Sequence, residues 1–284
     1  MVEQPSADWA EHLPGKPATL SFLPLAQGGA GESGWCTYAQ TLDDAPDVEI
    51  LCGGKNSKLP SAAAIWRQGN LLHFGFQQDP SQLNAVGRDL LENCIVYIAG
   101  FHADRPLAAV RSVFRPGVRS ETRAWLLSVM KDDQATAKSI ADRFFSGTRQ
   151  QQLAAMDTGA ARAWLRAHMT WLVPQPDGRL DVCPDLEALQ LDVRAATFLP
   201  DVATALHGEA GPQAAACRVL QRHCPEGPRG GAEPAAAGAW SAFLEANQDY
   251  LFFSENAGCI WVLDPLAKAR GVPSARLRGP ARRG

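Results

Sequence analysis

Residues 61–101, SAAAIWRQGNLLHFGFQQDPSQLNAVGRDLLENCIVYIAGF, decide how this chain folds. Within them, residues 63–67 and 71–76 are two short, mostly apolar runs that flank a turn-forming sequence at 68–70. Glycine and asparagine accept the positive φ that a tight hairpin turn requires, so this spacing predicts two paired strands.

A long amphipathic helix is predicted to follow the hairpin. Asp79 is a good N-cap, Pro80 suits the first helical position, and Gln82 completes a capping box. Apolar residues then recur at helical spacing, at Leu83, Val86, Leu90, Leu91, Cys94, Ile95 and Ile98. Gly100 predicts the end of the helix. Because its last turns are apolar on nearly all sides, we expect this helix to lie against a sheet.

The rest of the sequence divides into a strand-rich first part and a helix-rich second part. Strands are predicted at 18–26, 35–40, 48–52 and 179–183, and an aromatic hairpin at 251–254 and 260–263. Helices are predicted at 121–131, 134–145, 150–155, 160–172, 193–206, 212–223 and 235–247. The prediction is an α/β fold in which a small mixed sheet with a covering helix is followed by a helix-rich region. We place the two domains at 1–105 and 106–284.

Composition narrows the classes of partner. The 284 residues are 46% apolar and carry a formal net charge of −3, which is ordinary for a globular protein and gives no electrostatic reason to expect nucleic acid. No run reaches the 18 apolar residues of a transmembrane helix. The first residues lack the basic and apolar regions of a signal peptide. We therefore expect neither a nucleic-acid partner nor a membrane.

The cysteines are irregularly spaced. There are seven, at positions 36, 52, 94, 183, 217, 224 and 259, and no CxxC pair occurs. This pattern argues against a zinc ribbon and against a disulfide scaffold. We expect free thiols in a reducing compartment, the cytoplasm, with no metal and no cofactor.

One stretch carries a family resemblance. Residues 47–101, with PDVEILCGG, AAIWRQGNLLHFGF and LNAVGRDLLENCIVYIA, resemble the C-terminal part of class I glutamine-amidotransferase-like domains, especially the ThuA-like branch. Those domains end with a strand pair containing W-x-x-G-x-hydrophobic and then a helix. Their nucleophile lies in a G-x-C-x-G elbow, whereas residues 50–54 read ILCGG and lack the first glycine. The early βαβ units are also absent, so the resemblance implies a partial, degenerate version of the fold.

The C-terminal segment carries a second resemblance. Trp240, Phe243, Asn247 and the LFFS and DPLAKARGVP sequences resemble the end segment of uncharacterised bacterial multidomain proteins. That family implies no activity. The segment itself is typical of a packing unit, with aromatic anchors on a helix and a hairpin.

Three residues could form a catalytic site. Cys52 would be the nucleophile, His73 its base and Glu92 the group that orients the base, in a cysteine-dependent amide or ester hydrolase. The glycines after Cys52 could supply an oxyanion pocket. In the alternative interpretation, Cys52 is a buried apolar thiol and His73 is an ordinary strand residue. Aromatic residues on predicted helices are expected in the core, namely Trp125, Trp164, Trp171 and Trp240.

The leading functional hypothesis is an accessory or interaction protein without catalytic activity, built on a degenerate amidotransferase-like fold. The alternatives are the hydrolase and, from the ThuA-like resemblance, a carbohydrate-binding module. An interaction protein predicts an exposed apolar patch on a sheet edge or helix face, and a protein partner or a homodimer. A hydrolase predicts Cys52 exposed in a cleft next to His73.

Overall fold

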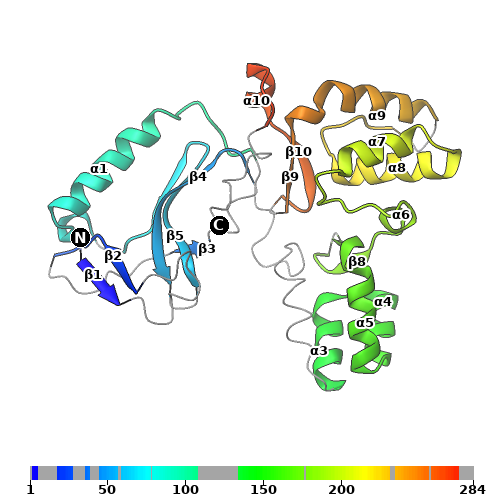
Figure 1. Ribbon diagram of the computed structural model, residues 1–284, viewed down its shortest axis with the longest axis horizontal. Coiled ribbons are helices and arrows are strands. Elements are labelled where there is room, and N and C mark those ends of the chain that lie inside the picture. Colours follow the sequence, from blue (N-terminus) through cyan, green and yellow to red (C-terminus); the bar gives the residue numbers. More distant parts are fainter. Residues whose placement is uncertain are drawn as a thin grey trace. The chain divides into compact units, whose positions relative to one another are not determined.

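The chain has the α/β architecture that the sequence predicts, with a small sheet and its helix followed by a helix-rich region (Figure 1). The computed structural model describes residues 2–5, 18–27, 36–38, 45–56, 59–77, 79–107, 134–175, 177–230, 234–255 and 257–274. These residues fall into two compact units, unit 1 within 2–107 and unit 2 within 134–274. The predicted helix at 121–131 lies outside the described residues.

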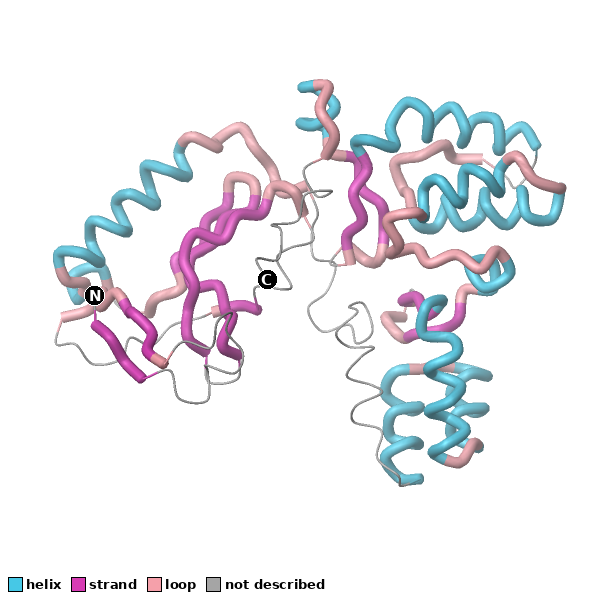
Figure 2. Tube along the Cα trace, in the orientation of Figure 1, coloured by secondary structure: helices cyan, strands magenta, loops and turns pink. Residues whose placement is uncertain are grey.

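Unit 1 is built around β5 (Leu59–Gln68), the longest strand (Figure 2). β4 (Val48–Asn56) pairs with it on one side, and β3 (Thr37–Tyr38) and β6 (Leu71–Phe74) pair with it on the other. All these pairings are antiparallel. A separate two-stranded sheet joins β1 (Val2–Pro5) to β2 (Thr19–Phe22).

The hairpin between β5 and β6 forms at the predicted turn. Gln68 pairs with Leu71, which leaves Gly69 and Asn70 as the two turn residues. Gly69 has φ of 54°, in the left-handed region that glycine adopts at little cost. A side chain at Gly69 would also meet the backbone of Arg105, so the turn has two reasons to keep a glycine.

The helix that follows begins later than the sequence predicts. The capping box of Asp79 and Gln82 forms, but it caps a single 3-10 turn, η3 (Pro80–Gln82). Leu83 then has extended backbone and bridges to Ala26. The long helix α1 (Ala85–Ala99) starts after a second cap, Asn84. The predicted start at Pro80 was wrong by five residues, because a tertiary contact with residues 24–27 interrupts the helical pattern.

Asn84 joins the helix to the preceding segment. Its side-chain oxygen accepts a hydrogen bond from the Gly87 amide at 2.9 Å, while its amide nitrogen donates to the Pro24 carbonyl at 2.9 Å and the Ala26 carbonyl at 3.4 Å. Its backbone amide also donates to the Leu25 carbonyl. One side chain therefore caps α1 and holds an extended segment about 60 residues earlier.

Replacing Asn84 with alanine is expected to destabilise unit 1 by about 2 kcal/mol, because a cap contributes about 1 kcal/mol and the Pro24 and Ala26 carbonyls lose their donor. Asn84→Ser keeps a cap acceptor and lacks the amide donor, so it should lose less than Asn84→Ala. Hydrogen exchange of α1 amides measures both variants. Equal protection in wild type and Asn84→Ala would contradict this role.

α1 is buried on one side only. Cys94 is 5% exposed and faces the interior of unit 1. At the C-terminal end, Tyr97 donates its hydroxyl to Glu49 of β4 at 2.5 Å, and the Arg67 guanidinium lies 3.8 Å from the centre of the Phe101 ring. These contacts fix α1 to the sheet through the face that carries Glu49 and Arg67.

Unit 2 is mainly helical, and Figure 1 shows its helices in two groups. The first group contains α3 (Gln134–Phe144), α4 (Gly147–Ala155) and α5 (Thr158–His168). The second contains α6 (Pro184–Ala188), α7 (Phe198–Leu206), α8 (Ala210–His223) and α9 (Pro234–Asn247). Each group has its own hydrophobic core.

A short hairpin links the two groups of helices. The predicted helix at 160–172 ends at His168, and a 3-10 turn, η4 (Met169–Trp171), leads into β7 (Leu172–Pro174). β7 pairs with β8 (Leu180–Val182), which buries Leu172 completely. Burial of this apolar run against a partner strand overrides its helical pattern.

The second core is closed by the predicted aromatic hairpin. β9 (Leu251–Ser254) follows η5 (Gln248–Tyr250), pairs with β10 (Ile260–Leu263), and leads to α10 (Pro265–Arg270). Trp261 stacks on Phe198 and donates its indole N–H to the Val193 carbonyl at 3.0 Å. Trp240 of α9 is 1% exposed, and the backbone of Gly227 lies directly against its ring.

Candidate functional site

The three predicted catalytic residues do not converge in unit 1. Cys52 is paired with Ile65 of β5, and His73 with Trp66, its neighbour on the same strand. Because successive side chains of a strand point to opposite faces, this register places Cys52 and His73 on opposite faces of the sheet. Glu92 is exposed on α1.

The surroundings of Cys52 are those of a structural thiol. β4 continues to Asn56, so Cys52 lies inside a strand and not at its end before a turn. Its Sγ donates to the Gly53 carbonyl at 3.3 Å. Burial, followed by the nearby Cys36 thiol, raises the pKa of Cys52. A nucleophilic thiol requires a lowered pKa, so the arrangement gives the hydrolase hypothesis no support.

The partner of His73 is aromatic. Its ring stacks on Trp66 with the two centres 5.6 Å apart. The register extends this row to Ile50 of β4, which pairs with Trp66 from the other side. This face of the sheet therefore carries apolar and aromatic side chains from three strands.

The tryptophans of unit 2 pack against its two cores, some of them only partly buried. Trp164 is stacked by His168, with ring centres 4.4 Å apart, and by the Arg149 guanidinium at 4.5 Å. Trp240 is buried. Trp240 therefore has the expected core role, Trp164 and Trp171 are half-buried against a core, and Trp125 lies outside the described residues.

Large apolar side chains are exposed mainly in unit 1. Among the described residues, Val272 is the one such side chain of unit 2, and the exposed apolar residues of unit 1 are Leu23, Ile50, Leu51, Leu71, Val86, Ile95, Val96 and Tyr97. Ile95 and Val96, which we call the α1 outer pair, are 58% and 74% exposed. The sequence contained the signal for this pair, since residues 94–98 are apolar on nearly every side of the helix while a single sheet covers only one.

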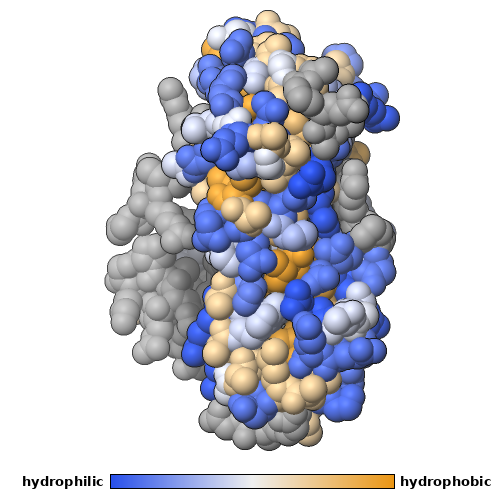
Figure 3. All heavy atoms as spheres, turned by 90° about the vertical axis from the view of Figure 1, so that its right-hand side faces the viewer, coloured by the Kyte–Doolittle hydropathy of each residue, from blue (hydrophilic) through white to orange (hydrophobic). Residues whose placement is uncertain are grey.

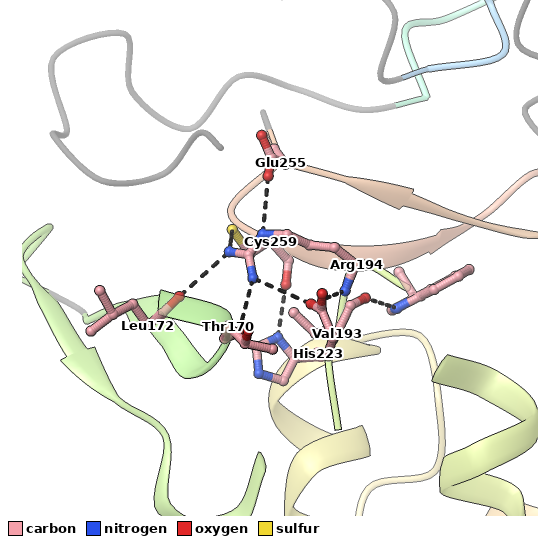
Figure 4. A network of polar contacts seen from close by, with 9 residues as sticks. Thr170, Leu172, Val193, Arg194, His223, Glu255 and Cys259 are labelled. Atoms are coloured by element: carbon pink, nitrogen blue, oxygen red, sulfur yellow. Dashed lines mark hydrogen bonds and ion pairs between the residues drawn. The ribbon is translucent and has the colours of Figure 1, made fainter. Parts of the chain in front are cut away.

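Unit 2 contains a partly buried polar network around Arg194 (Figure 4). The guanidinium donates to Glu255 at 3.0 Å, to the Cys259 thiol at 3.4 Å, and to the carbonyls of Thr170 and Leu172 at 3.4 Å each. The side chains of Arg194 and Glu255 are both 15% exposed. The network joins the start of β7, the loop before α7 and the turn between β9 and β10.

His223 of α8 contacts the same turn between β9 and β10. The ring is 1% exposed, and its Nδ1 is 2.7 Å from the Cys259 carbonyl oxygen, so Nδ1 carries the proton and donates. Its Nε2 is buried and has no hydrogen-bond partner among the described residues. Burial, opposed by the bond to Cys259, lowers the pKa of His223 to about 4. No sequence motif predicts this network, because its residues are far apart along the chain.

The part of the chain that the structure describes holds neither a cluster of metal ligands nor a membrane-spanning helix. No three His, Cys, Asp or Glu side chains there gather in a way that could hold a metal ion. No helix there has the length and apolar character needed to cross a membrane.

Comparisons with known proteins identify no family for this chain. Neither protein-family models, nor curated proteins, nor solved structures gave a match to the chain.

Proposed function

We propose that the chain is an interaction protein without catalytic activity, and that unit 1 supplies the surface on which a protein partner docks. The observation that carries this proposal is the uneven distribution of exposed apolar side chains. The α1 outer pair projects from a helix whose opposite side already packs on the sheet. Clustered apolar exposure of this kind is typical of protein–protein contact sites.

Unit 2 offers the contrasting surface. On the face seen in Figure 3, apolar residues form small patches separated by hydrophilic ones. Scattered exposure of that kind is normal for a soluble surface and favours no partner. We therefore assign docking to unit 1 and a supporting role to unit 2.

The test is site-specific photo-crosslinking in cells that express the full chain. A photoreactive amino acid at Val96 is expected to give one defined adduct with a protein partner or a second copy. The matched control is the same amino acid at Val272, which is 49% exposed in unit 2 and should give none. Light scattering of the purified chain distinguishes a second copy from another protein.

The double variant Ile95→Gln/Val96→Gln should lower the affinity for the crosslinked partner at least roughly tenfold, because burying two such side chains contributes a few kcal/mol. Its thermal stability should match wild type, since both positions are exposed and glutamine is a good helix former. Similar adducts from positions 96 and 272, or an adduct at 96 that the double variant leaves unchanged, would overturn the proposal.

A further inference from the structure

The turn between β9 and β10 contains a strained residue that side chains from outside the hairpin stabilise. Cys259 has φ of 59°, in the left-handed region that residues with a Cβ adopt at a cost. Two side chains from outside the hairpin hold this residue. Arg194 contacts its thiol, and His223 of α8 donates to its carbonyl (Figure 4).

The His223 site accepts only a neutral ring. A protonated ring would present an N–H at Nε2, where no acceptor lies among the described residues. The ring would also become a second cation beside Arg194 and next to Arg222, both of which disfavour its charge. Each of these effects makes a buried imidazolium costly.

We propose that His223 is an acid-sensitive latch of the C-terminal hairpin: the neutral ring fastens the turn between β9 and β10, and a protonated ring leaves its site and releases that turn.

Acidic groups on the surrounding elements do not offset the charge. Glu255 of the hairpin turn pairs with Arg194, and Asp185 of α6 pairs with Arg218 of α8. Asp201 of α7 and Glu245 of α9 are exposed. The neighbouring Cys224 stays a neutral thiol, because burial raises its pKa to about 12.

The direction of the effect follows from the two states of the ring. In the opened hairpin the imidazole is solvated and titrates near its ordinary value of 6.5, whereas in the closed hairpin its pKa is about 4. Above pH 6.5 both states are neutral, and nothing changes. As pH falls from 6.5 to about 4, only the opened state gains a proton. The equilibrium constant for opening should therefore rise roughly fiftyfold between pH 7 and about pH 4.5.

Hydrogen exchange of the full chain, corrected for the intrinsic pH dependence of exchange, measures this opening directly. In wild type, the exchange protection of peptides covering residues 251–263 should fall roughly fiftyfold between pH 7 and about pH 4.5. Peptides of α3 and α4 should keep their protection. His223→Asn retains a donor near the position of Nδ1 and does not titrate, so its hairpin should show little dependence on pH in this range. The matched control His207→Asn changes an exposed histidine and should behave as wild type.

Two results would overturn the latch. One is wild-type hairpin protection that stays constant between pH 7 and about pH 4.5. The other is the same pH dependence in His223→Asn as in wild type. If that variant fails to fold, an NMR titration of the His223 ring in wild type decides, because titration near pH 6.5 with the hairpin still closed contradicts the proposal.

Discussion

Replacing Gly227 with alanine is expected to destabilise unit 2 by about 3 kcal/mol, the upper part of the range for overpacking a buried core. An added Cβ would overlap the six-membered ring of Trp240. That ring cannot move aside easily, because Trp240 is almost fully buried and packs edge-on against Phe243. Thermal unfolding should show a midpoint lowered by roughly 6 to 12 °C.

A second glycine provides the matched control on the same helix as Trp240. An added Cβ at Gly238 of α9 meets nothing within 4 Å. Alanine there should stabilise the unit by about 1 kcal/mol, because it favours the helix over the unfolded chain. The two substitutions are chemically identical and should shift the midpoint in opposite directions. A Gly227→Ala variant as stable as wild type would show that the loop does not hold Trp240.

Replacing Arg194 with methionine is expected to cost unit 2 about 3 kcal/mol, the lower end of the usual loss when one member of a buried ion pair is removed, because this pair is only partly buried. Glu255 would lose its partner at 3.0 Å while remaining 15% exposed, and the Thr170 and Leu172 carbonyls would lose a donor. Urea unfolding measures the loss. The double variant Arg194→Met/Glu255→Gln should recover part of it, since no carboxylate is then left in the site.

Arg218→Met is the control for this prediction. Arg218 binds both oxygens of Asp185, with its shortest contact at 2.7 Å, so its geometry is at least as good as that of Arg194. Its side chain is 48% exposed, however, and solvent screens the pair. We expect a loss below about 1 kcal/mol. Equal losses from Arg194→Met and Arg218→Met would show that burial does not set the strength of these pairs.

The parts of the fold that the sequence predicts best are those with local signals. The hairpin turn at Gly69, the helix α8 and the aromatic hairpin β9–β10 follow from turn residues and periodicity within a few positions. The parts it predicts poorly depend on distant contacts. α1 begins late because Leu83 pairs with Ala26, and α7 begins at Phe198 because the Asp192 side chain accepts the Arg194 amide and turns the chain before the helix.

The candidate sites divide in the same way. The hypothesis of an interaction protein came from the resemblance to an amidotransferase-like fold that lacks its nucleophile elbow, and the apolar last turns of α1 carry a signal for its outer pair. The proposed grouping of Cys52, His73 and Glu92 relied on closeness along the chain. Strand register, which depends on pairing and not on spacing, puts the first two on opposite faces. Arg194, His223 and Cys259 meet only through tertiary packing and share no local pattern.

The double role of Asn84 sets a limit on how unit 1 can be shortened. A fragment that starts after Gln27 would keep all of α1 and every strand of the main sheet, from β3 to β6. It would nevertheless lack the carbonyls of Pro24 and Ala26, which orient the Asn84 amide, and the Leu25 side chain, which is 2% exposed in the interior. The smallest fragment able to fold as unit 1 should therefore begin before Pro24, and its boundary is set by a hydrogen-bonded asparagine rather than by the first strand of the sheet.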